Sequence, residues 1–158
     1  MLIGEQPGDQ EDLAGRPFVG PAGQILDRAL ARAGISREAA YLTNAVKRFK
    51  YVQQGKRRIH QTPSLADIKH YRWWLEQECE LVKPDIIVVL GAIAARAMTG
   101  KSVTISRTRG ELLEHAEHSL LMITAHPSYI LRIPDKAGQE IEYEKLVRDL
   151  SAAMNAVR

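Results

Sequence analysis

The sequence predicts an α/β fold built on a mostly parallel sheet. The segments 86–90 and 120–124 are continuous apolar runs, as expected of strands that are buried on both faces. Strand-like and helix-like patterns alternate along the chain, which favours parallel strands joined by helical crossovers. The predicted strands are 2–4, 40–44, 85–90, 110–113 and 120–125, and the predicted helices are 21–34, 64–82, 91–99 and 138–157.

Each predicted element follows from a local pattern. Ser64, with Asp67 three residues later, provides an N-cap and a first-turn acid for the helix at 64–82. The segment 45–63 carries neither period and is longer than most loops in a compact domain. We therefore expect it to be a functional loop.

The chain of 158 residues, 45% of them hydrophobic, is long enough for one domain spanning 1–158. No apolar run is long enough to cross a bilayer, and the N-terminus lacks the pattern of a signal peptide, so a cytoplasmic location is expected. Cys79 is the single cysteine, so the chain's own residues build neither a disulfide nor a cysteine-ligated zinc or iron-sulfur site.

Positive charge is concentrated in the predicted loop. The net charge is only +3, yet no acidic residue occurs from 39 to 66, and six basic residues fall within twelve positions. This pattern is typical of a surface that contacts a nucleic-acid backbone, although a solvated basic loop would have the same composition. The basic residues are Lys47, Arg48, Lys50, Lys56, Arg57 and Arg58.

Three polar segments directly follow predicted strands, where open α/β sheets bind their ligands. They are GEQPGDQED at 4–12, NAVK at 44–47 and HPS at 126–128. The acids of the first segment could hold Mg²⁺ or merely cap a solvated turn. Asn44 could read the edge of a base or cap a turn, and His126 could take part in catalysis or have a structural role.

Other residues are ambiguous when taken alone. Phe18, within GRPFVGP, could stack on a flat ligand or fill the core beneath its loop. His115 and His118 are spaced like metal ligands, but two ligands without a third favour a polar turn. Arg107 and Arg109 could contact a DNA backbone or be plain surface residues.

Taken in order, these segments resemble the uracil-DNA glycosylase superfamily, in the branch near the family 4 enzymes and UdgX. GEQPGDQED with DLAGRPFVGPAGQILDRAL resembles the first motif of that branch, TNAVK its base-recognition strand, KPDIIVVLGAIAARAM its central strand and helix, and AHPS its second motif. GKRRIH at 55–60 is similar to the inserted loop of UdgX-like proteins.

The resemblance implies a three-layer α/β/α sandwich with four to five strands that flips deoxyuridine out of DNA. It also implies roles for individual residues. Phe18 would stack on uracil, Asn44 would bond its Watson–Crick edge, and His126 would stabilise negative charge on the leaving base. His60 would capture the sugar covalently while Glu5 takes up the proton or orients the ring. Gln6, Asp9 and Ser128 would complete the pocket, and Lys47, Lys56, Arg57, Arg58 and Arg107 would contact DNA.

The sequence departs from this family in two respects. Relatives commonly hold a 4Fe-4S cluster, but the later ligand positions are occupied here by Arg48 and Tyr71. We therefore predict a protein without metal or other cofactor, in which Arg48 and Tyr71 contact each other through a cation-π or hydrogen-bonded interaction. The helix that precedes the first strand in relatives is also missing, so we expect that either the gene differs or the chain is shortened.

Four functions are consistent with the sequence. The leading prediction is a monomeric uracil-DNA glycosylase that attaches itself to the abasic site through His60 and acts at least on single-stranded DNA. A conventional enzyme would use water instead of His60, and a binding module would recognise uracil without excising it. A metal-dependent phosphate-transfer enzyme is the weakest alternative.

Overall fold

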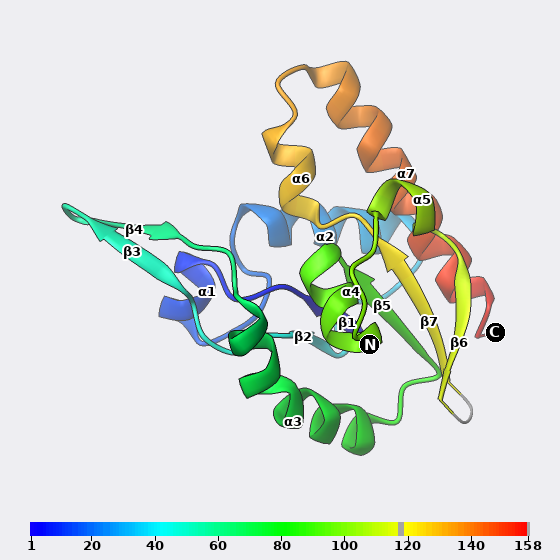
Figure 1. The fold of residues 1–158 in the computed structure, drawn as a ribbon. Coiled ribbons are helices and arrows are strands. Elements are labelled where there is room, and N and C mark those ends of the chain that lie inside the picture. Colours follow the sequence, from blue (N-terminus) through cyan, green and yellow to red (C-terminus); the bar gives the residue numbers. More distant parts are fainter. Residues whose placement is uncertain (117–118, 158) are drawn as a thin grey trace.

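A five-stranded sheet forms the centre of the molecule (Figure 1). The computed structural model describes residues 1–116 and 119–157. The strands run in the order β2-β1-β5-β7-β6; the first four are parallel, and β6 pairs antiparallel with β7. Their bounds are β1 Leu2–Gly4, β2 Leu42–Asn44, β5 Ile86–Leu90, β6 Leu112–Ala116 and β7 Ser119–Thr124. The predicted α/β fold with a mostly parallel sheet is confirmed.

Helices cover both faces of this sheet because successive strand residues point to opposite sides. Leu2, Val88 and Met122 pack with α2 (Pro21–Arg32) and α7 (Lys136–Asn155) in one hydrophobic core. Their strand neighbours Ile3, Val89 and Ile123 pack with α3 (Leu65–Val82) and α4 (Ala92–Thr99) in the second core. The two cores make the sheet the middle of three layers.

The longest helices begin at side-chain caps that are visible in the sequence. The Ser64 hydroxyl accepts a hydrogen bond from the backbone N–H of Asp67, and the Asp67 carboxylate accepts one from the backbone N–H of Ser64. This reciprocal capping box satisfies two amide groups that the first turn of α3 leaves free. At α7, the Asp135 carboxylate accepts from the backbone N–H of Gly138. These caps explain why α3 and α7 begin close to their predicted positions.

The segment 45–63 is not the irregular loop that the sequence predicts. It contains an antiparallel hairpin of β3 (Tyr51–Gln54) and β4 (Arg57–His60), which projects from the body of the molecule (Figure 1). Its strands escape a hydrophobic-pattern search because most of their residues are exposed. Gly55, at φ 57°, occupies the left-handed conformation that a two-residue hairpin turn requires.

Three short helices were also not expected from the sequence. They are α1 (Asp9–Ala14), α5 (Ile105–Thr108) and α6 (Pro127–Arg132). Segments of four to six residues are too short to show an apolar period. Within the described ranges, no helix is long and apolar enough to cross a membrane. The predicted polar turn at His115 and His118 cannot be followed, since His118 lies outside the described residues.

Candidate functional site

A cavity of about 1000 Å³ opens at the carboxyl ends of the parallel strands. Its walls combine the loops after β1, β2, β5 and β7 with the end of the hairpin. Seven of the predicted site residues line it, namely Glu5, Gln6, Phe18, Asn44, His60, His126 and Ser128. Residues from four separate parts of the sequence thus meet in one place, as expected for an open α/β sheet.

The loop that carries Phe18 is held in a strained conformation. Phe18 has φ 53°, a left-handed value that is uncommon for a bulky residue. The Glu11 carboxylate accepts hydrogen bonds from the backbone N–H groups of Val19 at 3.1 Å and Gly20 at 2.7 Å. The Arg37 guanidinium donates to the carbonyl oxygen of Phe18 at 3.1 Å. These contacts fix the aromatic ring at the cavity wall, 6.0 Å from the ring of His126 between centroids.

The absence of a side chain at Gly4 allows Phe18 and Asn44 to approach each other. A Cβ atom at Gly4 would lie 2.5 Å from both the Asn44 Oδ1 atom and the Phe18 ring. Asn44 ends β2 and is 6% exposed, and its side-chain amide has no hydrogen-bond partner among the described residues. The cavity therefore presents an aromatic face beside a buried amide that carries both a donor and an acceptor.

His126 is held as a neutral imidazole whose orientation is defined. Burial, and then the positive charges of Arg132 and His60, lower the pKa of His126 to about 4. Its Nδ1 atom accepts a hydrogen bond from the backbone N–H of Ser128 at 3.1 Å. The proton of the neutral ring must then be on Nε2, where it serves as a donor. His126 thus presents an N–H group without carrying a charge.

Glu5 and His60 meet where the hairpin reaches the cavity. The His60 Nε2 atom lies 3.1 Å from the Glu5 Oε1 atom. This distance suits an ion pair, but Glu5 Oε1 is buried and has no well-aligned hydrogen-bond donor among the described residues. Burial raises the pKa of Glu5, and the neighbouring His60 and Arg132 offset only part of that effect. Glu5 is therefore a carboxylate that can take up a proton more readily than usual.

Two sets of contacts hold the hairpin against the cavity. The Gln6 side chain bonds the backbone of Lys50 and Gln61 on either side of the hairpin, with N–O distances of 3.1 to 3.3 Å. Arg58 forms ion pairs with Asp9 at 2.5 Å and Asp12 at 2.6 Å. These contacts connect the strand that ends in His60 to the segment after β1.

Comparison with known families agrees with this arrangement. The family model of the uracil DNA glycosylase superfamily matches residues 1–151, nearly the whole chain. The chain belongs to this superfamily.

Similar proteins include named members of the superfamily. A type-4 uracil-DNA glycosylase of Thermotoga maritima is 37% identical over 133 residues, which cover 84% of this chain and 66% of that protein. The type-4 enzyme of Pyrobaculum aerophilum is 34% identical, with 88% and 71% covered. That of Archaeoglobus fulgidus is 30% identical, with 92% and 74% covered. The chain thus spans about two thirds to three quarters of the length of these relatives.

Two residues expected to take part directly in this glycosylase site have other contacts. Asp9, predicted to bind uracil, lies on α1 outside the cavity lining and is paired with Arg58. Lys47, predicted to contact DNA, donates to Thr43 and to the Asn44 carbonyl and forms a 2.6 Å ion pair with Glu78. The charges of both residues are already compensated within the fold.

The remaining predicted DNA contacts differ from one another in position. Lys56 and Arg57 are exposed at the tip of the hairpin and form no ion pair with any described residue. Arg58 is turned back onto the protein, with its guanidinium 5.2 Å from the Phe49 ring and 5.1 Å from the Tyr51 ring. Arg107 is exposed on α5, outside the cavity lining. Lys56 and Arg57 therefore present the hairpin's accessible positive charge.

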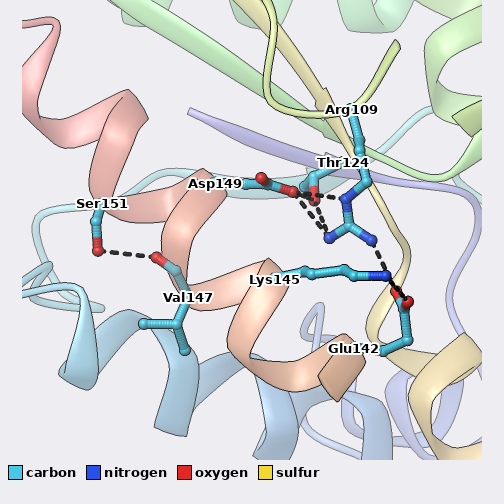
Figure 2. A network of polar contacts seen from close by, with 7 residues as sticks. All are labelled: Arg109, Thr124, Glu142, Lys145, Val147, Asp149 and Ser151. Carbon is cyan, nitrogen blue, oxygen red and sulfur yellow. Dashed lines mark hydrogen bonds and ion pairs between the residues drawn. The ribbon is translucent and has the colours of Figure 1, made fainter. Parts of the chain in front are cut away.

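The far end of the cavity contains a polar network that sequence reasoning did not find (Figure 2). Arg109 donates to Asp149 on α7 at 2.9 and 3.0 Å and pairs with Glu142 at 2.7 Å. Lys145 also bonds Glu142, at 2.6 Å. Arg37 and Arg132 were likewise not predicted, because neither belongs to a motif with an obvious chemical role. Glu11 lies in the GEQPGDQED segment, but the sequence did not show that it holds the Phe18 loop.

The donor atoms of this chain do not fit the 4Fe-4S cluster that the family resemblance would imply. A 4Fe-4S cluster needs four ligands, usually thiolates, and Cys79 is the single cysteine. No group of three metal-binding side chains occurs in the described part of the chain. Arg48 and Tyr71 do line one hollow, of about 580 Å³. The predicted contact between them is wrong: no bond or cation-π contact joins them in the described structure, and Tyr71 instead meets the edge of His70 at 4.7 Å.

Proposed function

We propose that the protein excises uracil from DNA and that His60 then captures the sugar of the abasic site. The observation that carries this proposal is the convergence of Phe18, Asn44 and neutral His126 on a cavity whose mouth holds the Glu5–His60 pair at 3.1 Å. The family assignment supports the excision step. The capture step rests on the geometry of His60.

The base would bind between Phe18 and the polar edge of the cavity. The Phe18 ring offers a face for stacking, and the Asn44 amide matches the alternating donor and acceptor atoms of the uracil edge. Such contacts require the nucleotide to be turned out of the DNA stack. Asn44 is 6% exposed and its side-chain amide has no partner among the described residues, so this amide is available to pair with uracil.

His126 would act on the leaving base. When the glycosidic bond breaks, its electron pair moves onto uracil, and negative charge develops on a carbonyl oxygen. The Nε2–H group of His126 would donate a hydrogen bond to that oxygen. A neutral donor suffices here because the interaction strengthens as the charge develops, which lowers the barrier. Since the pKa of His126 is about 4, this form is present throughout the neutral range.

His60 would then bond to the oxocarbenium-like sugar. The proton on His60 Nε2 passes to Glu5 Oε1, whose raised pKa helps it hold the proton. The freed Nε2 lone pair bonds to the anomeric carbon that uracil has left. Starting from the neutral imidazole, whose Nδ1 atom carries no proton, the transfer of the Nε2 proton to Glu5 balances the positive charge that the sugar brings to the new bond. The product is a neutral N-alkylated histidine joined to DNA.

A second function is supported by a specific observation. Glu5 Oε1 is buried without a well-aligned donor, so the same carboxylate could bind and activate a water molecule that attacks the sugar. The relatives carry the name of type-4 uracil-DNA glycosylases. In this case free abasic DNA would accumulate, and His60 would only orient Glu5. A module that binds uracil without excision would yield neither product.

The deciding experiment uses a uracil-containing single-stranded oligonucleotide. Wild-type protein, His60→Ala and the exposed-residue control His115→Ala are incubated with it, boiled in SDS and separated on a denaturing gel. We expect a shifted band for the wild type and His115→Ala and none for His60→Ala. Free uracil without a shifted band would indicate the water route. A retained shifted band in His60→Ala would assign capture to another residue, and binding without uracil release would indicate a recognition module.

The pH dependence of capture tests the role of Glu5. The carboxylate must be ionised to accept the proton, and burial raises its pKa. Capture should therefore decline as the pH falls, at a pH above the ordinary carboxyl range. Single-turnover rates between pH 4 and 8 measure this decline. In Glu5→Gln we expect at least ~100-fold slower capture, because the proton acceptor is lost; an unchanged profile would exclude Glu5 as the base.

The partner of the site would be uracil-containing DNA, including single strands. Lys56 and Arg57 would contact its phosphates from the hairpin tip, and Arg107 would add a more distant contact from α5. We also propose that the protein acts as a monomer, because a site that takes up one flipped base needs no second subunit. We also propose that the protein works without an iron-sulfur cluster, since its donor set does not fit one. Iron analysis and the visible absorption spectrum of the purified protein test that proposal.

A further inference from the structure

A chain of hydrogen bonds on α6 leads from an exposed arginine to the buried imidazole of the site. The Arg132 guanidinium donates from Nη1 to the Ser128 hydroxyl oxygen at 3.0 Å. That hydroxyl lies 2.8 Å from the His126 Nδ1 atom. Ser128 and Arg132 are four residues apart, so they share one face of the short helix. The chain of hydrogen bonds ends at Nδ1. The other ring nitrogen, Nε2, is the one that would face a bound base.

This arrangement favours one tautomer of His126. Arg132 can only donate, so it occupies a lone pair of the Ser128 oxygen and leaves the hydroxyl proton free to point at Nδ1. The backbone N–H of Ser128 also points at Nδ1, at 3.1 Å. A proton on Nδ1 would point at this N–H group, so two donors would face each other with no acceptor between them. The hydrogen bonds therefore keep the proton on Nε2.

We propose that Arg132 is a positioning residue for His126, acting through the Ser128 hydroxyl to keep the Nε2–H group directed into the cavity. The catalytic consequence rests on the proposed glycosylase function, whereas the effect on the imidazole does not require any substrate. The charged and titratable groups that act on His126 are Arg132 on α6 and His60 on β4. Arg132 also acts on the ring by charge, because it lowers the pKa of His126.

An exposed arginine at a DNA-binding cavity has an obvious competing role, which is contact with a phosphate group. The two roles differ in what they change. A phosphate contact strengthens DNA binding and leaves the free protein's imidazole unaffected. A positioning role alters the tautomer and pKa of His126 before DNA is present, and it alters the rate of base release more than the affinity for DNA.

The first measurement is made on the free protein. Imidazole ¹⁵N chemical shifts of His126 are recorded against pH in the wild type, in Arg132→Met and in Arg148→Met, which removes an exposed arginine outside the cavity lining. We expect the wild type and Arg148→Met to show the Nε2–H tautomer and a pKa near 4. In Arg132→Met only the Ser128 backbone N–H still opposes a proton on Nδ1, so the share of the Nε2–H tautomer should fall, and the pKa should rise because a nearby positive charge is lost while burial remains. Unchanged His126 shifts in Arg132→Met would overturn the proposal, whether or not the protein releases uracil.

The second measurement asks whether the effect passes through Ser128. Single-turnover uracil release is compared in Arg132→Met, Ser128→Ala and the double variant. We expect each single change to slow release about 3- to 10-fold, and the double variant to be little slower than either, because coupled residues are not additive. The proposal would be contradicted if the rate losses of the two single variants multiplied in the double variant. It would also be contradicted if only KM changed and the rate of uracil release did not. Arg132→Lys serves as the second variant if Arg132→Met folds poorly: it keeps the charge, and we expect only partial recovery of the rate.

Discussion

Two groups of ion pairs, one around Arg109 and one around Arg58, differ mainly in burial. The Arg109 network joins the end of α5 to β7 and α7 and is largely enclosed, with side-chain exposures of 14% for Arg109, 16% for Glu142 and 13% for Asp149 (Figure 2). The hairpin pairs are more open, with 21% for Arg58, 48% for Asp9 and 36% for Asp12. The chemistry of the groups is the same, but the solvent around them is not.

Burial determines what each group contributes. An enclosed charge that loses its partner remains desolvated and unpaired, which is strongly destabilising. An exposed pair contributes little to stability, since water and salt replace the partner. We therefore interpret the Arg109 network as a fixed brace between β7 and α7, and the Arg58 pairs as an adjustable tether that places His60.

Breaking the enclosed network should have the largest effect on stability. In Asp149→Ala, Arg109 loses the carboxylate that bonds both its Nε and Nη2 atoms and keeps Glu142, and the Thr124 hydroxyl loses the acceptor of its proton. We expect the free energy of unfolding to fall by about 3 kcal/mol. Urea titration followed by circular dichroism measures this change, with Ser151→Ala on the exterior of α7 as a milder comparison. A loss below about 1 kcal/mol would remove the distinction between the two groups.

Breaking the exposed tether should instead affect activity. The paired change Asp9→Asn with Asp12→Asn removes both charges opposite Arg58 while preserving side-chain size. We expect little loss of stability because the pairs are exposed to water and salt, but capture to slow about 10-fold because His60 is no longer held in place. Unfolding and single-turnover capture are compared with the exposed-acid control Glu111→Gln. If the free energy of unfolding fell as much as in Asp149→Ala, the tether would be a structural brace as well.

Charges at the hairpin tip should have the smallest effect. Replacing Lys56 and Arg57 with glutamine removes two unpaired cations without touching the tether or the cavity. Affinity for a single-stranded oligonucleotide should fall a few-fold, and the slope of log affinity against log salt should become shallower by about 0.7 for each lost phosphate contact. Fluorescence anisotropy at several salt concentrations measures both quantities, with Lys136→Gln as the control. An unchanged slope would mean that DNA does not reach the tip.

Sequence patterns were informative where burial imposes a period or where a motif has a fixed wording. The apolar runs that form β5 and β7, and the capping residues Ser64 and Asp67, could be read directly. So could the loops that bring Asn44 and His126 to the cavity. The hairpin could not, because its strands face solvent on much of their surface, and an exposed hairpin has no continuous hydrophobic signature.

The sequence by itself determined the fold class, the family and the residues with chemical potential at the strand ends. Only the tertiary structure decided what each charge does. Arg58 and Lys47 carry the same charge as Lys56 and Arg57, yet the fold places carboxylates from α1 and α3 beside the first two and none beside the others among the described residues. Coulomb interactions depend on distance and solvent exposure, and residues 49 positions apart, such as Asp9 and Arg58, acquire a distance only when the chain folds.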